Sequence, residues 1–339
     1  MFKFVISAVV GVVVIVGGWL HFNNALPVPA PVKQNIFVAT TSPQSISPSS
    51  VPSVTKSITA PQKEQVVNIL AKYYSTFSTN SIPLGDGKVS SLPKVGYVYS
   101  CQTSFRGGGA SHSGDWIHGS TWDMSQKISV LGKVYWPNAS FSSVINGITR
   151  TITGNGLPVS EPTGTFPISV SDPAFQIDRN PNAIRAQNIS YSLPSNPQFA
   201  SSPSCLPMGA IGIALDGVTI YNALDDGGRD AVAHEVQDLC DGHPQMAGQY
   251  HYHGPSPCMP GADKPETLVG YALDGYGIYS KYDSKGHEYT DADLDECHGL
   301  TSEVIWNGKL TNIYHYVLTD EYPYTLGCFR GTPLRHGTM

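Results

Sequence analysis

The chain has 339 residues, of which 40% are hydrophobic and only 14% are charged, whereas an average globular protein has roughly 25% charged residues. It contains 34 Gly, 26 Pro and 18 Tyr, a composition that favours β structure with long loops over a bundle of helices. The formal net charge is −6 and no cluster of lysine and arginine occurs, which argues against nucleic-acid binding.

The N-terminus predicts export. Residues 4–20 form an uncharged apolar run preceded by Lys3, close to the roughly 20 residues that cross a bilayer. A cleaved signal peptide needs a small-x-small site soon after such a run, and the candidate at residues 28–30 is poor because a proline follows it directly. We therefore predict an uncleaved transmembrane anchor over residues 1–22, with a cleaved signal peptide as the alternative. Either one makes the rest of the chain extracytoplasmic, in a periplasm or at a cell surface.

Three further segments follow the anchor. Residues 23–60 are rich in Pro, Ser and Thr, and we predict a disordered linker. Residues 61–78 carry apolar side chains at three- and four-residue spacing after Pro61, which predicts a stem helix. From residue 80 to 339 short β-favouring runs alternate with Gly, Pro and Asn. We predict one mainly β domain there, a β-rich α+β fold resembling a sandwich or a barrel.

Six cysteines agree with export, because an even number in an exported chain indicates three disulfides. Binding of a metal by thiolates is disfavoured, since no Cys-x-x-Cys pair occurs. The six are Cys101, Cys205, Cys240, Cys258, Cys297 and Cys328.

An internal repeat relates residues 211–258 to residues 269–328. Each copy runs in the order strand, Asp-Gly turn, strand, acidic segment with a cysteine, and a Tyr-His strand. The last of these is Tyr-His-Tyr-His at residues 250–253 and Tyr-His-Tyr-Val at residues 314–317. We interpret the pattern as a duplicated unit whose second copy has lost one histidine.

The repeat leaves two disulfide patterns open. The one we prefer closes short loops and consists of Cys240–Cys258, Cys297–Cys328 and, by remainder, Cys101–Cys205. The alternative links the copies to each other through Cys240–Cys297 and Cys258–Cys328.

The strongest candidate site is a cluster of histidines. In an extended strand His251 and His253 point to the same face, and His243 lies eight residues before the first of them. Three imidazoles can fill three corners of a tetrahedral site, and nitrogen ligands suit zinc or copper. Asp274 or Asp216, each at an Asp-Gly turn, is the expected fourth ligand or orienting group. The alternative is that the histidines are structural and bond backbone carbonyls.

Weaker candidates lie elsewhere. His112, His118 and His234 are secondary candidates, and the first two either reach the same cleft or are exposed to solvent. The acidic run at residues 291–295 has part of the spacing of a calcium loop but lacks the required glycine and final glutamate, so an EF-hand is rejected and calcium is the less favoured ion. No Gly-x-Ser-x-Gly motif indicates a serine nucleophile.

Seven ordered motifs make residues 95–330 resemble a known family. They lie at residues 155–158, 164–167, 180–184, 214–217, 238–243, 248–253 and 270–279. The chain resembles the YHYH-domain family, which implies an exported protein suspected of binding metal. Relatives often carry a histidine after the Asn-Gly-x-Pro element, whereas Val159, Ser160 and Glu161 stand there in this chain.

These observations support two hypotheses. In the first, the chain is a membrane-anchored protein that binds a divalent metal; if it is an enzyme, a metal-activated water is the expected nucleophile of a hydrolase. In the second, it is a non-catalytic cell-surface module that binds a glycan or a protein, and the histidines are structural. Nothing in the sequence indicates an oligomeric state.

Overall fold

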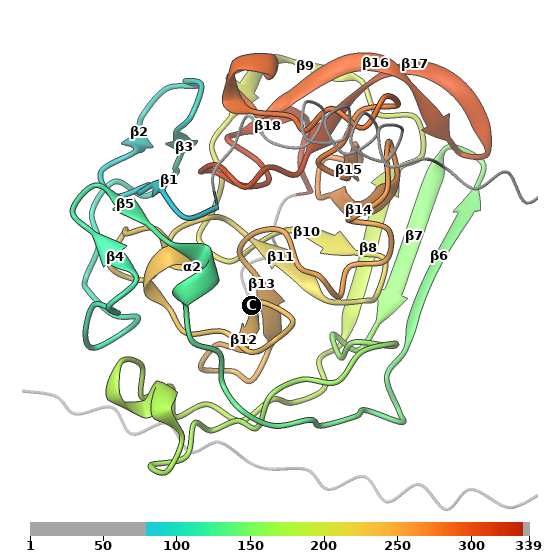
Figure 1. Cartoon of the computed structure of the whole chain (residues 1–339). Coiled ribbons are helices and arrows are strands. Elements are labelled where there is room, and N and C mark those ends of the chain that lie inside the picture. Colours follow the sequence, from blue (N-terminus) through green and yellow to red (C-terminus); the bar gives the residue numbers. More distant parts are fainter. Residues whose placement is uncertain (1–78, 335–339) are drawn as a thin grey trace, which may run out of the picture. The chain divides into compact units, whose positions relative to one another are not determined.

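The computed structural model describes residues 79–334 (Figure 1). The predicted anchor, linker and stem helix, at residues 1–22, 23–60 and 61–78, lie outside this range. Within it, none of the helices has the length and apolar character needed to cross a bilayer.

Short strands dominate, as expected for a chain rich in Gly, Pro and Tyr. The strands are β1 (Ile82–Pro83), β2 (Val89–Ser90), β3 (Val98–Tyr99), β4 (Ile117–His118), β5 (Thr121–Trp122), β6 (Phe141–Asn146), β7 (Thr149–Gly154), β8 (Ile189–Pro194), β9 (Phe199–Ser204), β10 (Ala210–Ala214), β11 (Thr219–Tyr221), β12 (Gly242–Pro244), β13 (Tyr250–Tyr252), β14 (Leu268–Ala272), β15 (Gly277–Tyr279), β16 (Gly299–Trp306), β17 (Lys309–Val317) and β18 (Phe329–Gly331). The helices are α2 (Ala231–His234) and the 3-10 turns η1 (Met124–Gln126), η2 (Pro173–Gln176) and η3 (Asp291–Asp293).

An eight-stranded sheet forms the centre, in the order β12-β13-β11-β10-β14-β15-β17-β16. The prediction of a mainly β fold is confirmed. This sheet is open, because its edge strands β12 and β16 do not pair with each other, so the barrel alternative is wrong for the described residues.

The central sheet has an approximate two-fold symmetry. Strands β10 and β14 pair antiparallel at its middle, with Ile213 opposite Tyr271. In each half a hairpin is followed by a parallel strand, β13 beside β11 and β17 beside β15. The edge strands β12 and β16 then pair antiparallel with these. The two sequence copies thus occupy the two halves of one sheet.

The Asp-Gly dipeptides build the two hairpin turns. The carboxylate of Asp216 accepts a hydrogen bond from the backbone N–H of Val218, and Gly217 has a positive φ of 89°. Asp274 does the same for the N–H of Tyr276 beside Gly275. Aspartate closes its own turn and glycine adopts the left-handed backbone at little cost, which explains the dipeptide at both places.

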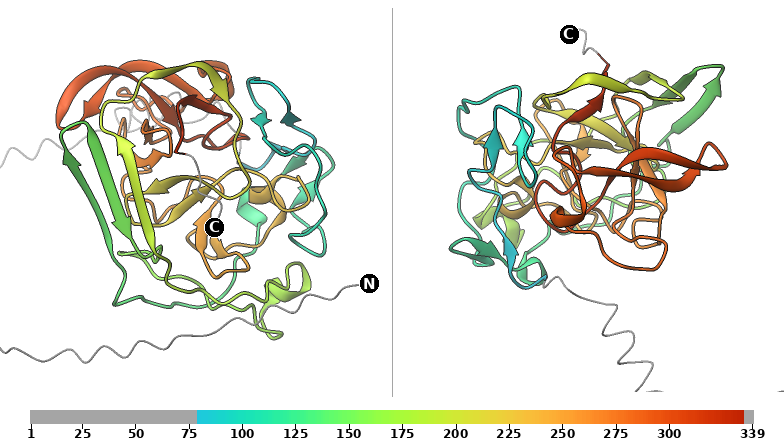
Figure 2. Two further views of the ribbon diagram at one scale, coloured as in Figure 1. Left: turned by 180° about the vertical axis from the view of Figure 1, so that it is seen from behind. Right: turned by 90° about the horizontal axis from the view of Figure 1, so that it is seen from above.

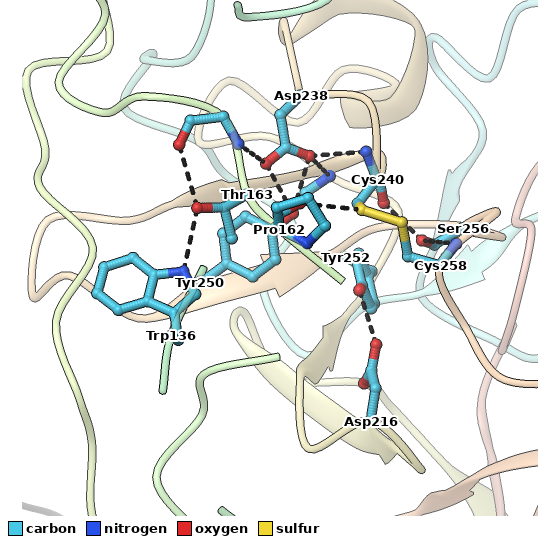
Figure 3. Close-up of a disulfide and its surroundings, with 12 residues drawn as sticks. Trp136, Pro162, Thr163, Asp216, Asp238, Cys240, Tyr250, Tyr252, Ser256 and Cys258 are labelled. Atoms are coloured by element: carbon cyan, nitrogen blue, oxygen red, sulfur yellow. Dashed lines mark hydrogen bonds between the residues drawn. A yellow bond between two sulfur atoms is a disulfide. The ribbon is translucent and has the colours of Figure 1, made fainter. Parts of the chain in front are cut away.

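Buried tyrosines bond each Tyr-His strand to two buried or half-buried aspartates, as Figure 3 shows for the first copy. The hydroxyl of Tyr252 donates to Asp216 at 2.8 Å, and the hydroxyl of Tyr250 donates to Asp238 at 2.8 Å. The second copy repeats both bonds, Tyr316 to Asp274 at 2.6 Å and Tyr314 to Asp295 at 2.9 Å. Because a buried hydroxyl needs a partner, these pairs fix which face of the strand the tyrosines occupy. The histidines between them must face the other way.

Smaller sheets pack around the central one. The three-stranded sheet β6-β7-β8 stands beside β10 and β14 (Figures 1 and 2). Its apolar side chains Ile152, Ile189 and Leu193 form a cluster with Ile213 and Tyr271 of the central sheet. This second layer covers the middle of the sheet and leaves the β12–β13 end to other segments.

Three disulfides join the structure, and they are the preferred set: Cys101–Cys205, Cys240–Cys258 and Cys297–Cys328. The second of them lies directly before β12 (Figure 3). There the hydroxyl of Ser256 also donates to the carbonyl of Cys240 at 2.6 Å. The bridge therefore holds the start of β12 against the chain that follows β13.

Replacing Cys240 and Cys258 together by serine is expected to lower the free energy of unfolding by about 3 kcal/mol, because the bridge closes a short loop with a sequence separation of 18. Replacing Cys101 and Cys205, whose sequence separation is 104, together by serine is expected to lower the free energy of unfolding by about 5 kcal/mol. Urea unfolding of both variants gives the comparison. An unchanged midpoint in the first variant would contradict the bracing role.

Candidate metal centre

Three buried histidines come together at the β12–β13 end of the central sheet. His243 on β12 is paired across the ladder with His251 on β13, and His253 follows that strand. Their side chains are 3–4% exposed, and one nitrogen of each lies within 4.8 Å of the others. The alternation of side chains along a strand predicted that His251 and His253 lie on one face. The antiparallel pairing of β12 with β13 brings the ring of His243 beside them. Among residues 79–334 this is the only group of His, Cys, Asp or Glu with the spacing of an ion site.

Backbone carbonyls fix the orientation of two of the rings. The Nδ1 of His251 lies 3.0 Å from the carbonyl oxygen of Gln249, and the Nδ1 of His253 lies 2.5 Å from that of Asn222. A carbonyl only accepts, so each Nδ1 carries the proton and each Nε2 presents a lone pair. This is the second-sphere arrangement that metal-binding histidines usually have.

The two Nε2 atoms of His251 and His253 lie only 3.0 Å apart. Two lone pairs at this distance repel each other unless a cation lies between them. Zinc binds imidazole nitrogen at about 2.0–2.1 Å, so two nitrogens of a tetrahedral site are about 3.3 Å apart. The observed separation of this pair is close to that value, so these two rings fit a metal ion.

His243 is buried and makes no hydrogen bond through its ring within residues 79–334. Neither of its ring nitrogens has a hydrogen-bond partner among the described residues. A buried polar group without a partner costs free energy, and such exceptions require an explanation. An ion held together with His251 and His253 supplies one.

Glu235 is the residue of this site that the sequence analysis missed. Its Oε2 lies 3.4 Å from the Nε2 of His243 and 3.4 Å from the Nε2 of His253, and it has no hydrogen bond among the described residues. Glu235 follows α2, whose N-terminus is capped by Asp230. Its place between the apolar residues 231–233 and Val236 was a usable signal, because a glutamate is rarely buried unless it has a partner.

Burial sets the protonation of the whole cluster. It lowers the pKa of His253 to about 4, and it lowers the pKa values of His243 and His251 well below the usual range, helped by the neighbouring rings. The imidazoles are therefore neutral at pH 7, which is the form that binds a metal. Burial also raises the pKa of Glu235 well above its usual value, with a further contribution from the nearby charge of Asp225.

A cleft of about 530 Å³ opens onto the three rings and Glu235. Its lining includes the carboxylates of Asp178, Asp225 and Asp226 and one guanidinium, that of Arg179. Arg229 forms an ion pair with Asp225 at 2.7 Å, so the charge of Arg229 does not offset the other carboxylates. The excess of acidic groups makes the cleft attractive to a cation.

The second copy of the repeat retains only part of this site. His315 takes the place of His251, and its Nδ1 lies 3.1 Å from the carbonyl oxygen of Ile313. Leu300 is paired with it as His243 is paired with His251, and Val317 takes the place of His253. One imidazole cannot hold an ion alone, so the two halves share a scaffold and differ in chemistry.

The proposed aspartate ligands lie elsewhere. Asp274 accepts hydrogen bonds from the hydroxyl of Tyr316 and from the backbone N–H of Gly331, in the second copy. Asp216 accepts a hydrogen bond from the hydroxyl of Tyr252, whose side chain points to the face of β13 opposite that of His251. Both carboxylates act in turns and tyrosine pairs, and Glu235 is the carboxylate beside the histidines.

The secondary histidines also lie apart from the cluster. His112 and His118 are exposed. His234 is buried, and its Nε2 lies 2.9 Å from a carboxylate oxygen of Asp86. The acidic run at residues 291–295 forms the turn η3 and is used in local hydrogen bonds, such as that from the backbone N–H of Thr290 to Asp293.

Comparison with known proteins identifies one domain. Residues 190–291 match the family model described as YHYH protein, so this part of the chain carries the YHYH domain. The match covers the three histidines, Glu235 and the Asp-Gly hairpins of both copies. No curated protein and no solved structure matches the chain.

Proposed function

We propose that this chain is a metal-binding protein that holds one divalent ion, zinc or copper, on the Nε2 atoms of His243, His251 and His253. The observation that carries the proposal is the 3.0 Å approach of two nitrogens whose protons are both on the far side of their rings. A cation between them turns the repulsion of their lone pairs into attraction.

The donor set selects the class of ion. Neutral imidazoles suit zinc and copper, whereas calcium and magnesium take oxygen ligands. Glu235 lies beside two of the rings, where it balances part of the charge of an ion or hydrogen-bonds a group brought to it. When bound, such an ion supplies a Lewis acid that can polarise a carbonyl or phosphoryl oxygen. The open cleft gives a substrate access to that position.

We also propose that the domain works outside the cytoplasm and is anchored by residues 4–20. Three disulfides among the described residues support export, because such bridges persist in oxidising compartments. The apolar run supports the anchor.

Zinc retention is expected to persist at pH 5.5. The pKa of His253 is lowered from 6.5 to about 4, so this imidazole stays neutral until the pH falls toward 4. Protons therefore begin to displace the ion well below the pH at which an exposed histidine site loses it. Equilibrium dialysis of the full chain at pH 7.5, 5.5 and 4, with an oligohistidine peptide as reference, measures this. Failure to bind zinc or copper at pH 7.5 contradicts the proposal, and half-loss near pH 6.5 contradicts the buried site.

A further inference from the structure

A second cleft, of about 470 Å³, is also lined by residues of the chain segment 232–243. Residues of this segment alternate between the two clefts: Val232, Gln237 and Asp241 line the second, whereas Glu235 and His243 line the first. The remaining wall of the second cleft is largely apolar and includes Trp122, Ile128, Pro255, Pro257, Tyr282 and Tyr324. Volume and lining match those of small-molecule sites.

Lys127 brings an ammonium group into this cleft without a carboxylate partner. Its Nζ donates to two neutral acceptors, the carbonyl of Val232 and the side-chain oxygen of Gln237. An ammonium has three N–H donors, so one is left over. No ion pair involves Lys127 among the described residues. Burial lowers its pKa to about 8, which leaves the group mostly charged at pH 7.

Asp241 brings a carboxylate into the same cleft, and it too lacks a partner. No described residue donates a hydrogen bond to its side chain. Its backbone has a positive φ of 55°, which is uncommon outside glycine and is adopted most readily by Asn, Asp and His among the other residues. The Cys240–Cys258 bridge beside it, and the hydrogen bond from its N–H to Asp238, hold it in this position.

Lys127 and Asp241 line the same cleft, yet no ion pair joins them. The other lysine of the cleft, Lys281, is already matched, because it lies 2.6 Å from Asp320 and 3.3 Å from Glu288. Besides the exposed carboxylate of Asp263, the cleft thus holds two half-buried charges of opposite sign, Lys127 and Asp241, that no ion pair among the described residues matches. Partly buried charges are costly unless they are paired and hydrogen-bonded.

We propose that this cleft binds a free α-amino acid with an apolar side chain, with the ligand's ammonium group at Asp241 and its carboxylate at Lys127. Such a zwitterion carries both complementary charges on one small frame, and its side chain packs against the apolar wall. The site is separate from the histidine cluster and does not depend on a bound metal.

The first test uses the full chain with its disulfides intact and needs no variant. L-Leucine and L-phenylalanine are titrated by calorimetry and by tryptophan fluorescence, since Trp122 lines the cleft. N-Acetyl-L-leucine lacks the ammonium and L-leucinamide lacks the carboxylate, so each is expected to bind about tenfold or more weakly than L-leucine. No binding of either amino acid at millimolar concentration overturns the proposal. Equal binding of all four compounds also overturns it, because an apolar groove alone would then suffice.

Two variants test the assigned partners. Asp241→Asn keeps a residue that tolerates the left-handed backbone, and Lys127→Met keeps the apolar stem. Each substitution is expected to lower the affinity for L-leucine about tenfold or more. It should also reduce the difference in affinity between L-leucine and the derivative that lacks the matching charge. Asp115→Asn and Lys133→Met, both exposed and outside the cleft, make the same charge changes and should leave binding unchanged. Zinc content and circular dichroism report whether the variants are folded; undiminished binding in folded Asp241→Asn or Lys127→Met contradicts the assignment.

Discussion

Replacing His251 and His253 together by alanine is expected to remove the bound ion from the chain. Both rings present a lone pair to the same point, and His243 alone cannot hold a divalent ion against buffer. Loss of a second-sphere partner already costs 10–100-fold in affinity, so loss of two ligands should exceed about 100-fold. Metal analysis after equilibrium dialysis against zinc measures the change.

The second copy of the repeat provides the matched control. His315→Ala removes an imidazole that is equally buried and equally bonded to a backbone carbonyl. It lies in the half of the sheet where Leu300 and Val317 occupy the positions that hold histidines in the first copy. This variant should keep one ion per chain, whatever its stability. Equal metal content in the double variant and the wild type would show that the cluster is structural, as the competing hypothesis holds.

Installing two histidines in the second copy is expected to create a second ion site. Leu300→His and Val317→His place rings at the positions that correspond to His243 and His253, around His315. The Nδ1 of His315 is already bonded to a carbonyl oxygen, so its Nε2 is free to bind. The zinc content should rise from one to two ions per chain, measured by dialysis and by displacement titration.

The single variant Leu300→His is the control for the engineered site. It supplies only two imidazole rings and should therefore bind a second ion much more weakly than the double variant. Val317 is fully buried, so the larger ring can disturb packing, and circular dichroism must show a native fold. A folded double variant that still binds one ion would mean that the equivalence of the two halves does not extend to the side chains. It would also weaken the assignment of ligand roles in the first copy.

Much of this site follows from local rules. The period of two in a strand places His251 and His253 together and the tyrosines behind them. The Asp-Gly dipeptides mark both hairpins. The repeat of the cysteines left two disulfide patterns open, and the one that closes short loops is the set formed. These features depend on residues close together in the sequence or on an internal repeat. Both can be recognised in a single sequence, so these features could be predicted.

The remaining features depend on contacts between distant segments. Asp274 and Asp216 were expected near the rings because they are acidic and lie at turns. Each instead accepts a hydrogen bond from a buried tyrosine hydroxyl of a Tyr-His strand. Glu235 reaches the rings because α2 ends against β12, which no periodicity indicates. The open sheet likewise depends on the antiparallel pairing of β10 with β14 across the two copies.

The central claim is that one ion lies between the Nε2 atoms of His243, His251 and His253. Crystals of the full chain grown with zinc, and measured on both sides of the zinc absorption edge, test it most directly. The account predicts one anomalous peak at about 2.0–2.1 Å from each of the three nitrogens. A peak elsewhere with the three rings unchanged, or no peak in crystals at saturating zinc, would contradict it.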